Sequence, residues 1–197
     1  MQEPFRKDLK HLSWAEVFAR QEARAFLIDQ WLQALSLKPG DHVLEVGAGP
    51  GYVTMVLAER VGREGLVYAV DRSAEAMAWL ERLQTERAVS QIQRIIADAA
   101  ALAPEGLSVD SALISMVLHH AEDPGGILGA VARLLPPGGR AVVAEFHPEG
   151  PCEQGPPREH RIGPEQVRAW CEDAGLELCN QRRQSPEHYM VLVRKRS

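Results

Sequence analysis

The chain has 197 residues, of which 45% are hydrophobic and 25% are charged, as expected of an ordinary globular protein. Its length suits one domain, residues 1–197, with a core of three layers. The formal net charge of −5 at pH 7 argues against nucleic acid as a partner, because a large nucleic-acid interface needs a basic face.

The N-terminal region is predicted to be helical. Residues 13–16 have the Ser-x-x-Glu form of a capping box, which opens a helix. Apolar residues then recur at helical spacing as far as Pro39, and they are Phe26, Leu27, Trp31, Leu32 and Leu35. This helical cap, residues 1–37, precedes the first strand. We therefore expect it to pack on the sheet or to cover the ligand site, while residues 38–197 form the core.

A glycine-rich turn follows the first predicted strand, Val43–Val46. The turn contains Gly47, Gly49 and Gly51, and it leads into an amphipathic helix that ends near Gly62. Glycine adopts positive φ angles and lets a ligand approach the backbone closely. A strand, a glycine-rich turn and a helix in this order are typical of a nucleotide-binding unit.

An acidic residue closes the second predicted strand, Leu66–Val70. Asp71 lies 20 residues after Gly51, and an acid at this place can bind the hydroxyl groups of a ribose. We therefore predict a nucleoside site between the glycine turn and Asp71. Two alternatives without a ligand stay open: a plain tight turn at the glycines, and a cap for the helix that starts at Ser73.

The rest of the chain alternates strands with helices, which predicts parallel strands joined by right-handed crossovers. A short segment, residues 184–188, separates the last two strands, so these should form an antiparallel hairpin. We predict an α/β fold with a three-layer, Rossmann-like sheet of about seven strands, mostly parallel, and helices on both faces. The further strands are Ile92–Ile96, Ser111–Val117, Arg140–Phe146, Glu177–Arg183 and Tyr189–Arg194, and the further helices begin at Ser73, Asp123 and Pro164.

The spacing of the glycines indicates which nucleoside binds. A dinucleotide fingerprint, Gly-x-Gly-x-x-Gly, would need its third glycine at position 52, which is Tyr52. Glu45 stands two residues before the turn, and a carboxylate there repels a pyrophosphate but suits a cationic ligand. S-adenosylmethionine carries an ammonium and a sulfonium as well as a ribose and an adenine. A nicotinamide-dependent oxidoreductase is therefore disfavoured.

With this turn the chain resembles the class I S-adenosylmethionine-dependent methyltransferases, and most closely the small-molecule branch that includes quinone methyltransferases. The family pattern Glu/Asp-x-Gly-x-Gly-x-Gly appears as residues 45–51, and two segments, 117–124 and 134–140, are similar to signatures of that branch. The resemblance implies that Asp71 binds ribose and that Asp98 lies near the adenine amino group. The cofactor-binding residues that it implies are Glu45, Gly47, Gly49, Gly51, Asp71, Arg72, Asp98, Ala99 and Met116.

The resemblance also implies an activity. The cofactor would be S-adenosylmethionine, the product S-adenosylhomocysteine, and the partner a small-molecule methyl acceptor. The alternative is a catalytically inactive protein that binds the cofactor and acts by interaction.

Two adjacent histidines, His119 and His120, follow the fourth predicted strand, at the edge of the sheet where ligands bind in open α/β folds. Methyl transfer from a sulfonium needs a base only when the acceptor must lose a proton. We hypothesise that His119 or His120 positions or deprotonates the acceptor. The alternative is a structural pair, of which one caps the following segment and the other packs beneath it.

The acceptor pocket is expected between the N-terminal region and the polar loop of residues 147–163. Trp14 and His147 are the candidate pocket residues, because a small, partly apolar molecule needs apolar surface with a few polar groups. Further candidates are Phe5, His11 and Phe18. In the alternative, Trp14 only attaches the first helix to the domain and His147 lies in a surface loop.

No metal is expected, because the spacing of His147, Cys152 and His160 fits no common zinc pattern. The three cysteines are an odd number without paired spacing, which predicts a reduced, cytoplasmic protein. Residues 1–10 lack the apolar core of a signal peptide, and no apolar run approaches the roughly 18 residues of a membrane span. The sequence leaves both a monomer and a homodimer open.

Overall fold

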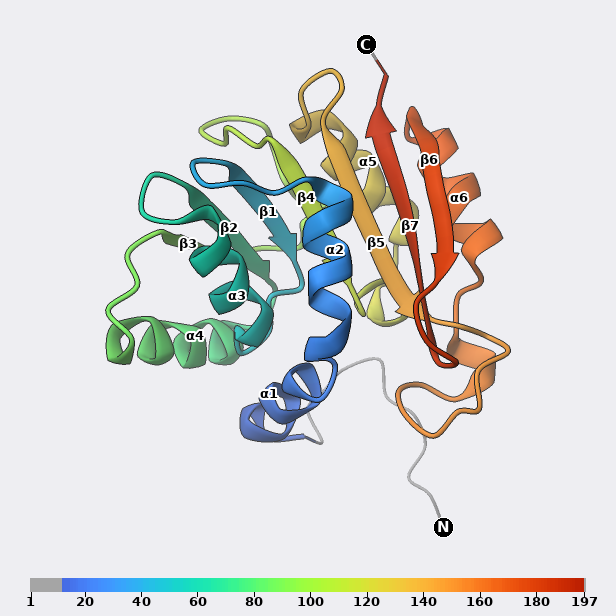
Figure 1. The fold of residues 1–197 in the computed structure, drawn as a ribbon, viewed down its shortest axis with the longest axis horizontal. Helices are drawn as coiled ribbons and strands as arrows, with labels where there is room; N and C mark the ends of the chain where they lie inside the picture. The colour runs from blue at the N-terminus through green and yellow to red at the C-terminus, as the bar shows by residue number, and fades with distance from the viewer. Residues whose placement is uncertain (1–11, 197) are drawn as a thin grey trace.

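The computed structural model describes residues 12–196, which contain one mixed β-sheet flanked by helices (Figure 1). The candidate residues Phe5 and His11 lie outside the described residues. The strands are β1 His42–Val46, β2 Leu66–Asp71, β3 Ile92–Ile96, β4 Ser111–Ser115, β5 Arg140–Phe146, β6 Leu176–Arg183 and β7 His188–Lys195. The α-helices are α1 Trp14–Glu22, α2 Ile28–Leu35, α3 Tyr52–Val61, α4 Ala74–Glu86, α5 Pro124–Leu134 and α6 Pro164–Asp173.

The seven strands lie in the order β3-β2-β1-β4-β5-β7-β6. Strands β1 to β5 pair in parallel, whereas β7 runs antiparallel between β5 and β6. The predicted Rossmann-like sheet with a C-terminal antiparallel hairpin is therefore confirmed. The strand order reverses on either side of β1, and at such a switch point the loops after neighbouring strands diverge and leave a crevice at the carboxyl ends.

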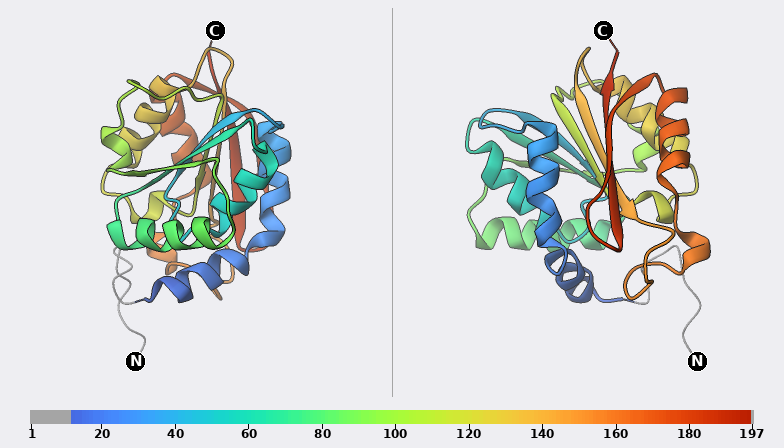
Figure 2. Two further views of the ribbon diagram at one scale, coloured as in Figure 1. Left: turned by 90° about the vertical axis from the view of Figure 1, so that its left-hand side faces the viewer. Right: turned by 45° about the vertical axis from the view of Figure 1, so that its right-hand side comes forward.

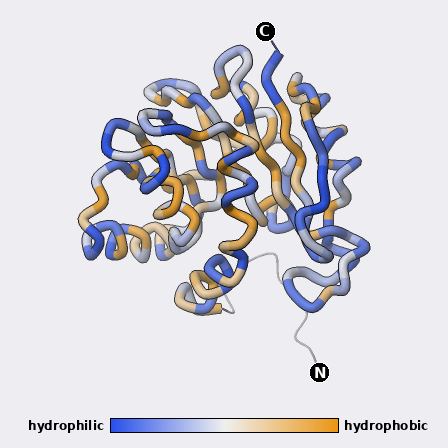
Figure 3. The backbone as a smooth tube through the Cα atoms, in the orientation of Figure 1, coloured by the Kyte–Doolittle hydropathy of each residue, from blue (hydrophilic) through white to orange (hydrophobic). Residues whose placement is uncertain are grey.

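Helices cover both faces of the sheet because the central strands are apolar on both sides. On one face, α2, α3 and α4 pack against residues such as Val43 and Leu113. On the other face, α5 and α6 pack against the intervening residues, such as Leu44 and Ile114. The two helical layers are visible in Figure 2, and the central strands are largely hydrophobic in Figure 3. Within residues 12–196, none of the helices combines the length and the apolar character that crossing a membrane requires.

The N-terminal helical region is divided into two helices. Helix α1 begins with the predicted capping box, in which the Ser13 hydroxyl accepts from the Glu16 N–H and the Glu16 carboxylate accepts from the Ser13 N–H. The chain then bends at Arg24, and α2 packs on the sheet through the buried Trp31. The bend leaves Phe26, which the periodicity places on an apolar face, 59% exposed. In the described part of this region, α2 packs on the sheet and α1 lies across the carboxyl edge (Figure 1).

Strand β4 is shorter than the sequence predicts. The apolar run suggests a strand through Val117, but β4 ends at Ser115 because Met116 adopts a left-handed φ of 56°. The N–H of Met116 still donates to the Ala144 carbonyl on β5, at 2.8 Å. A 3-10 turn, Leu118–His120, follows and places both histidines beside the end of β5.

Candidate active site

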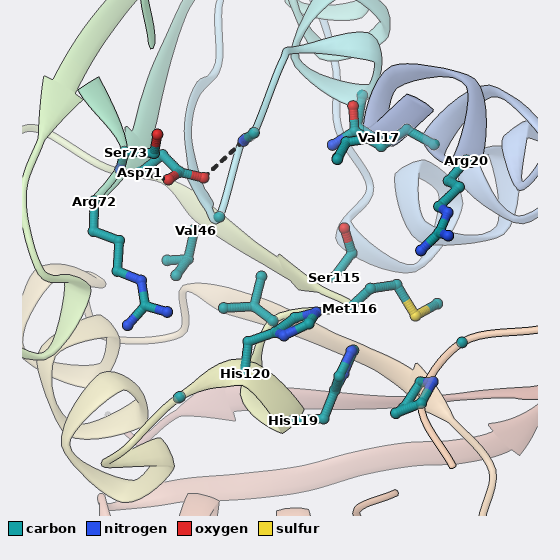
Figure 4. Close-up of a pocket in the computed structure, with 18 of the residues that line it drawn as sticks. Val17, Arg20, Val46, Asp71, Arg72, Ser73, Ser115, Met116, His119 and His120 are labelled. Atoms are coloured by element: carbon teal, nitrogen blue, oxygen red, sulfur yellow. Dashed lines mark hydrogen bonds between the residues drawn. The ribbon is translucent and has the colours of Figure 1, made fainter. Parts of the chain in front are cut away.

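A cleft of about 1950 Å³ lies at the carboxyl edge of the parallel strands (Figure 4). A pocket for one small ligand occupies about 300–1,000 Å³, so this cleft has room for two molecules. The loops that follow β1 to β4 form its floor. Helix α1, the bend after it and residues 152–157 of the loop after β5 lie opposite, and we call these segments the outer wall.

Most of the sequence-predicted site residues line this cleft. They are Trp14, Gly47, Gly49, Asp71, Arg72, Asp98, Ala99, Met116, His119 and His120. Three predicted site residues, Glu45, Gly51 and His147, are not among the lining residues. Fragments that are up to about a hundred residues apart in the chain therefore meet at one site, as the parallel topology requires.

The glycine turn is bent tightly against the end of β2. The Gly47 N–H donates to the Val70 carbonyl at 2.8 Å. A Cβ atom on Gly47 would approach Val117 Cγ2 to 2.1 Å, and one on Gly51 would approach Leu80 Cδ1 to 2.3 Å. Gly51 is therefore required by packing at the start of α3, and the structure gives it no contact with the cleft.

Asp71 receives two backbone hydrogen bonds where β2 ends (Figure 4). The Gly49 N–H donates to Oδ2 and the Ser73 N–H donates to Oδ1, both at 2.9 Å. Each carboxylate oxygen has two lone pairs, so both retain acceptor capacity toward the cleft. Burial raises the pKa of Asp71, while the N–H donors oppose that rise. The residue thus supports the start of α4 and lines the cleft as well.

A second carboxylate and an arginine extend this end of the cleft. Asp98 follows β3, the neighbour of β2, and its Oδ1 accepts from the Ala100 N–H at 3.0 Å. The Asp98 side chain is exposed, as is Arg72, which extends along the cleft in Figure 4. The floor beside β2 and β3 therefore carries two acids that a ligand hydroxyl or amino group can reach.

Glu45 is not among the residues that line the cleft, and its contact with the cofactor stays a prediction. It lies on the α3 face of β1, where Thr54 Oγ1 donates to its Oε2 at 2.6 Å. Only 1% of Glu45 is exposed, and burial raises its pKa to about 7. The sequence shows that an acid precedes the turn, but the strand's alternation decides which face it takes.

Gln21 of α1 lines the cleft, and the sequence does not reveal it. Its Nε2 donates to the Ala48 carbonyl, and the Tyr52 N–H donates to its Oε1, both at 3.0 Å. One side chain thus attaches the outer wall to the glycine turn. Its partners are 27 and 31 residues away, so no local pattern marks it.

A buried His–Glu pair forms the other half of the floor. His119 Nδ1 lies 2.6 Å from Glu145 Oε2, and the Leu118 N–H donates to Glu145 Oε1 at 2.8 Å. Burial alone would raise the pKa of Glu145, but His119, His120 and the Leu118 N–H together hold it below its usual range. An ionised Glu145 favours the tautomer with the proton on Nδ1, which makes Nε2 the accepting nitrogen of His119.

His147 is not among the residues that line the cleft, and its place in the acceptor pocket stays a prediction. Its Nδ1 accepts from the Glu149 N–H at 3.1 Å, and its ring packs against Tyr189 with centroids 5.8 Å apart. Phe18 likewise packs on Tyr52, edge to face at 5.3 Å, and so attaches α1 to α3. Of the candidates within residues 12–196, Trp14 lines the cleft and Phe18 and His147 do not.

The loop after β5 is held by a buried arginine. Arg161 Nη1 lies 2.5 Å from Glu187 Oε2, and its other nitrogens donate to the carbonyls of Gln154 and Pro156. These bonds fix residues 152–157 as part of the outer wall. Among the described residues, no three His, Cys, Asp or Glu side chains are grouped as a metal site would require.

Known proteins resemble this chain in sequence and in fold. Residues 37–194 match a family model described as a methyltransferase domain. A ubiquinone/menaquinone biosynthesis C-methyltransferase of Xanthomonas oryzae pv. oryzae is 36% identical over 111 residues, which are 56% of this chain and 44% of that protein. An uncharacterised 37.1 kDa transposon protein of Streptomyces fradiae is 34% identical over 134 residues, 68% of this chain and 38% of its own. The chain thus spans less than half the length of these two relatives.

The fold comparison agrees with the sequence comparison. The crystal structure of an S-adenosylmethionine-dependent methyltransferase from Aquifex aeolicus superposes with a TM-score of 0.83 at 21% identity. The match covers 93% of this chain and 98% of that one, and it shows a shared fold. Because the family model spans most of the chain, the protein belongs to the class I S-adenosylmethionine-dependent methyltransferases.

Proposed function

We propose that the protein transfers a methyl group from S-adenosylmethionine to a small-molecule acceptor. One observation carries the proposal: a single cleft has two unlike halves. Asp71 and Asp98 lie beside the glycine turn in one half, and His119, held by the buried Glu145, lies in the other. The volume of about 1950 Å³ accommodates a nucleoside cofactor and an acceptor together.

The described residues fit the cofactor. Gly49 lines the cleft, and an added Cβ would meet only the Gln21 amide, at 3.2 Å. Asp71 has the acceptor capacity that ribose hydroxyls need, and Asp98 can accept from the adenine amino group. When bound, S-adenosylmethionine supplies a methyl group on a sulfonium, a leaving group that its positive charge already activates.

The chain's own contribution is chiefly alignment. Holding two reactants in line replaces a bimolecular encounter, an effect worth up to about 7–11 kcal/mol in well-oriented systems. His119 adds a base for acceptors that must lose a proton, since Glu145 keeps Nδ1 protonated and Nε2 accepting. Glu145 is buried and does not line the cleft, so it acts as a positioning residue through His119.

Calorimetry with S-adenosylhomocysteine and with NAD tests the cofactor assignment. We expect the wild type to bind S-adenosylhomocysteine and the Gly49→Val variant to lose binding, because the valine side chain enters the cleft. Gly40→Val is the matched control: Gly40 has a similar left-handed φ, +90° against +57°, with no atom within 4 Å of an added Cβ. Binding of NAD in place of S-adenosylhomocysteine, or normal binding by Gly49→Val, would overturn the proposal.

Methyl transfer from radiolabelled S-adenosylmethionine to a panel of phenols, acids and amines tests the acceptor class. With an acceptor in hand, His119→Gln should lower turnover at saturating cofactor by about 10²-fold or more. Glu145→Gln should lower it through the same histidine and displace the pH profile, which a purely structural defect would not do. Equal turnover in His119→Gln, His120→Gln and wild type would show that neither histidine acts as the base.

We also propose that the protein works in a reducing compartment, as expected for the cytoplasm. Cys152, Cys171 and Cys179 are all free thiols. Cys171 is buried, and burial raises its pKa to about 12, so it stays a packed thiol. No disulfide therefore contributes to the fold of residues 12–196.

A further inference from the structure

The outer wall presents two arginines to the cleft. Arg20 on α1 and Arg24 at the bend after it both line the cleft, as does Val17 one turn earlier. Figure 4 shows Arg20 projecting from α1 toward Met116. Within residues 12–196, neither guanidinium donates to a carboxylate or a carbonyl. Nothing in the proposed chemistry so far uses these two cations.

Arg24 contrasts with a second arginine on the same aromatic ring. The Arg24 guanidinium carbon lies 5.7 Å from the centroid of Phe146, and that of Arg161 lies 5.3 Å from it. The Arg161 guanidinium pairs with Glu187 and donates hydrogen bonds to backbone carbonyls. Arg24 is half-buried and has no such acceptor in the described chain. Removing an ionised guanidinium from water without a hydrogen-bond acceptor costs free energy. A bound anion would supply that acceptor to Arg24.

The charges around Arg24 agree with this geometry. Burial and the neighbouring Arg20 lower the pKa of Arg24 to about 10, while Glu145 acts in the opposite direction. Glu145 is already bound to His119 and to the Leu118 N–H, so its carboxylate is occupied. An anion from outside the chain would relieve the repulsion between the two arginines.

Building on the proposed methyltransferase function, we propose that the methyl acceptor carries a carboxylate and that Arg24 binds it beside Phe146. A guanidinium matches a carboxylate with two parallel hydrogen bonds. Phe146, Met116 and Val17 are apolar residues of the cleft lining, which suits an acid with an aromatic or aliphatic body. The acids Asp71 and Asp98 at the other half repel the carboxylate, so the acceptor enters in one orientation.

The cofactor is the other source of a carboxylate, because its amino-acid end carries one. Arg20 also lines the cleft from α1, so it is the alternative partner for that end. Arg24 lies over Phe146 at the end of β5. Substituting Arg20 and Arg24 in turn therefore distinguishes a cofactor carboxylate from an acceptor carboxylate, and one set of titrations measures the binding of both ligands.

Calorimetric titration of the protein saturated with S-adenosylhomocysteine tests the assignment, with benzoate and phenylacetate as probes and benzamide and phenylacetamide as neutral controls. The acids should bind at least about tenfold more tightly than the amides, the effect of one charge-assisted hydrogen-bonded pair. Arg24→Gln should abolish that preference, and Arg24→Lys should retain part of it. The affinity for S-adenosylhomocysteine should stay within about twofold in both variants, which also shows that they fold.

Arg20→Gln is the matched comparison, the same change one turn earlier. The assignment fails if acids bind no more tightly than amides, or if Arg20→Gln rather than Arg24→Gln removes the preference. It also fails if Arg24→Gln weakens S-adenosylhomocysteine about tenfold and leaves acid binding intact, since the anion would then be the cofactor's. A wild type that does not bind S-adenosylhomocysteine is a separate result, which overturns the proposed function itself.

Discussion

Three carboxyl groups near the carboxyl edge of the sheet differ in pKa because their hydrogen-bond donors differ. Glu45 has one side-chain donor, Thr54, and burial raises its pKa to about 7. Burial also raises the pKa of Asp71, although two backbone N–H groups oppose the rise. The pKa of Glu145 is lowered in spite of burial, because the imidazole of His119 lies against it. Three carboxyl groups at the same edge of the sheet therefore differ in how readily they hold a proton.

Asp71→Ala tests the ribose contact. The substitution removes a carboxylate that lines the cleft, and a hydrogen bond to a charged group contributes about 1.5–3 kcal/mol. We expect the free energy of S-adenosylhomocysteine binding to weaken by roughly 1–3 kcal/mol in calorimetry. Ser73→Ala is the control, because it removes the hydroxyl that caps α4 and keeps both the Asp71 carboxylate and the Ser73 N–H that donates to it. Equal binding by wild type and Asp71→Ala would show that Asp71 only supports the fold and does not bind the ribose.

Glu45→Gln tests the pH dependence of stability. Unfolded Glu45 ionises near pH 4.5, whereas the folded carboxyl ionises at about pH 7, so the folded state holds the extra proton between these values. The stabilisation from that proton is complete below pH 4.5 and is lost as the pH rises through about 7. Glutamine can still accept from Thr54 but does not titrate.

Urea unfolding of the wild type and of Glu45→Gln at several pH values measures this effect. The free energy of unfolding of the variant, minus that of the wild type, should increase by up to about 3 kcal/mol between about pH 4.5 and pH 8. A difference that stays constant with pH would show that Glu45 has the same pKa in the folded and the unfolded protein.

At the scale of elements, α1 is held to the core by few polar contacts. Gln21 supplies two hydrogen bonds to the glycine turn, and Phe18 packs on Tyr52. The N-terminal half of the outer wall therefore depends on one amide side chain far more than on its own helical propensity, since an isolated helix this short is marginal in water.

Gln21→Ala should loosen α1 selectively. Two lost hydrogen bonds predict a decrease of about 1–2 kcal/mol in the free energy of unfolding. Amide hydrogen exchange should accelerate in Trp14–Glu22 and stay slow in the central strands. Glu22→Gln, a change at the exposed neighbouring position, should have neither effect. Unchanged exchange in α1 of the Gln21→Ala variant would mean that other contacts hold the helix.

The sequence predicts most elements of this fold because their signals are local. The glycine turn, the capping box at Ser13 and the apolar strands depend on neighbours within a few residues, and all appear as expected. The bend at Arg24 and the end of β4 at Met116 depend on tertiary contacts, which periodicity does not register. The orientation of Glu45 and the partner of His119 likewise emerge only when strands align.

At the scale of the whole molecule, ligand binding should stabilise one cooperative unit. S-adenosylhomocysteine at 100 times its dissociation constant adds about 2.7 kcal/mol to the folded state. For a chain of this length that raises Tm by about 5–10 °C. Circular dichroism and tryptophan fluorescence should report the same single transition, and NAD should not shift it. Two separate transitions would contradict a single domain.

Two kinds of structure bound the cleft, and they come from different parts of the chain. Its floor consists of loops that follow the paired strands β1 to β4, so a change there disturbs the core. Its outer wall comes from α1 near one end of the chain and from residues 152–157 far along it. Because folds keep their scaffold while loops diversify, the two segments of the outer wall form an exchangeable part. Under the proposed function, replacing these two segments would change the acceptor and leave the residues proposed for the methyl donor in place.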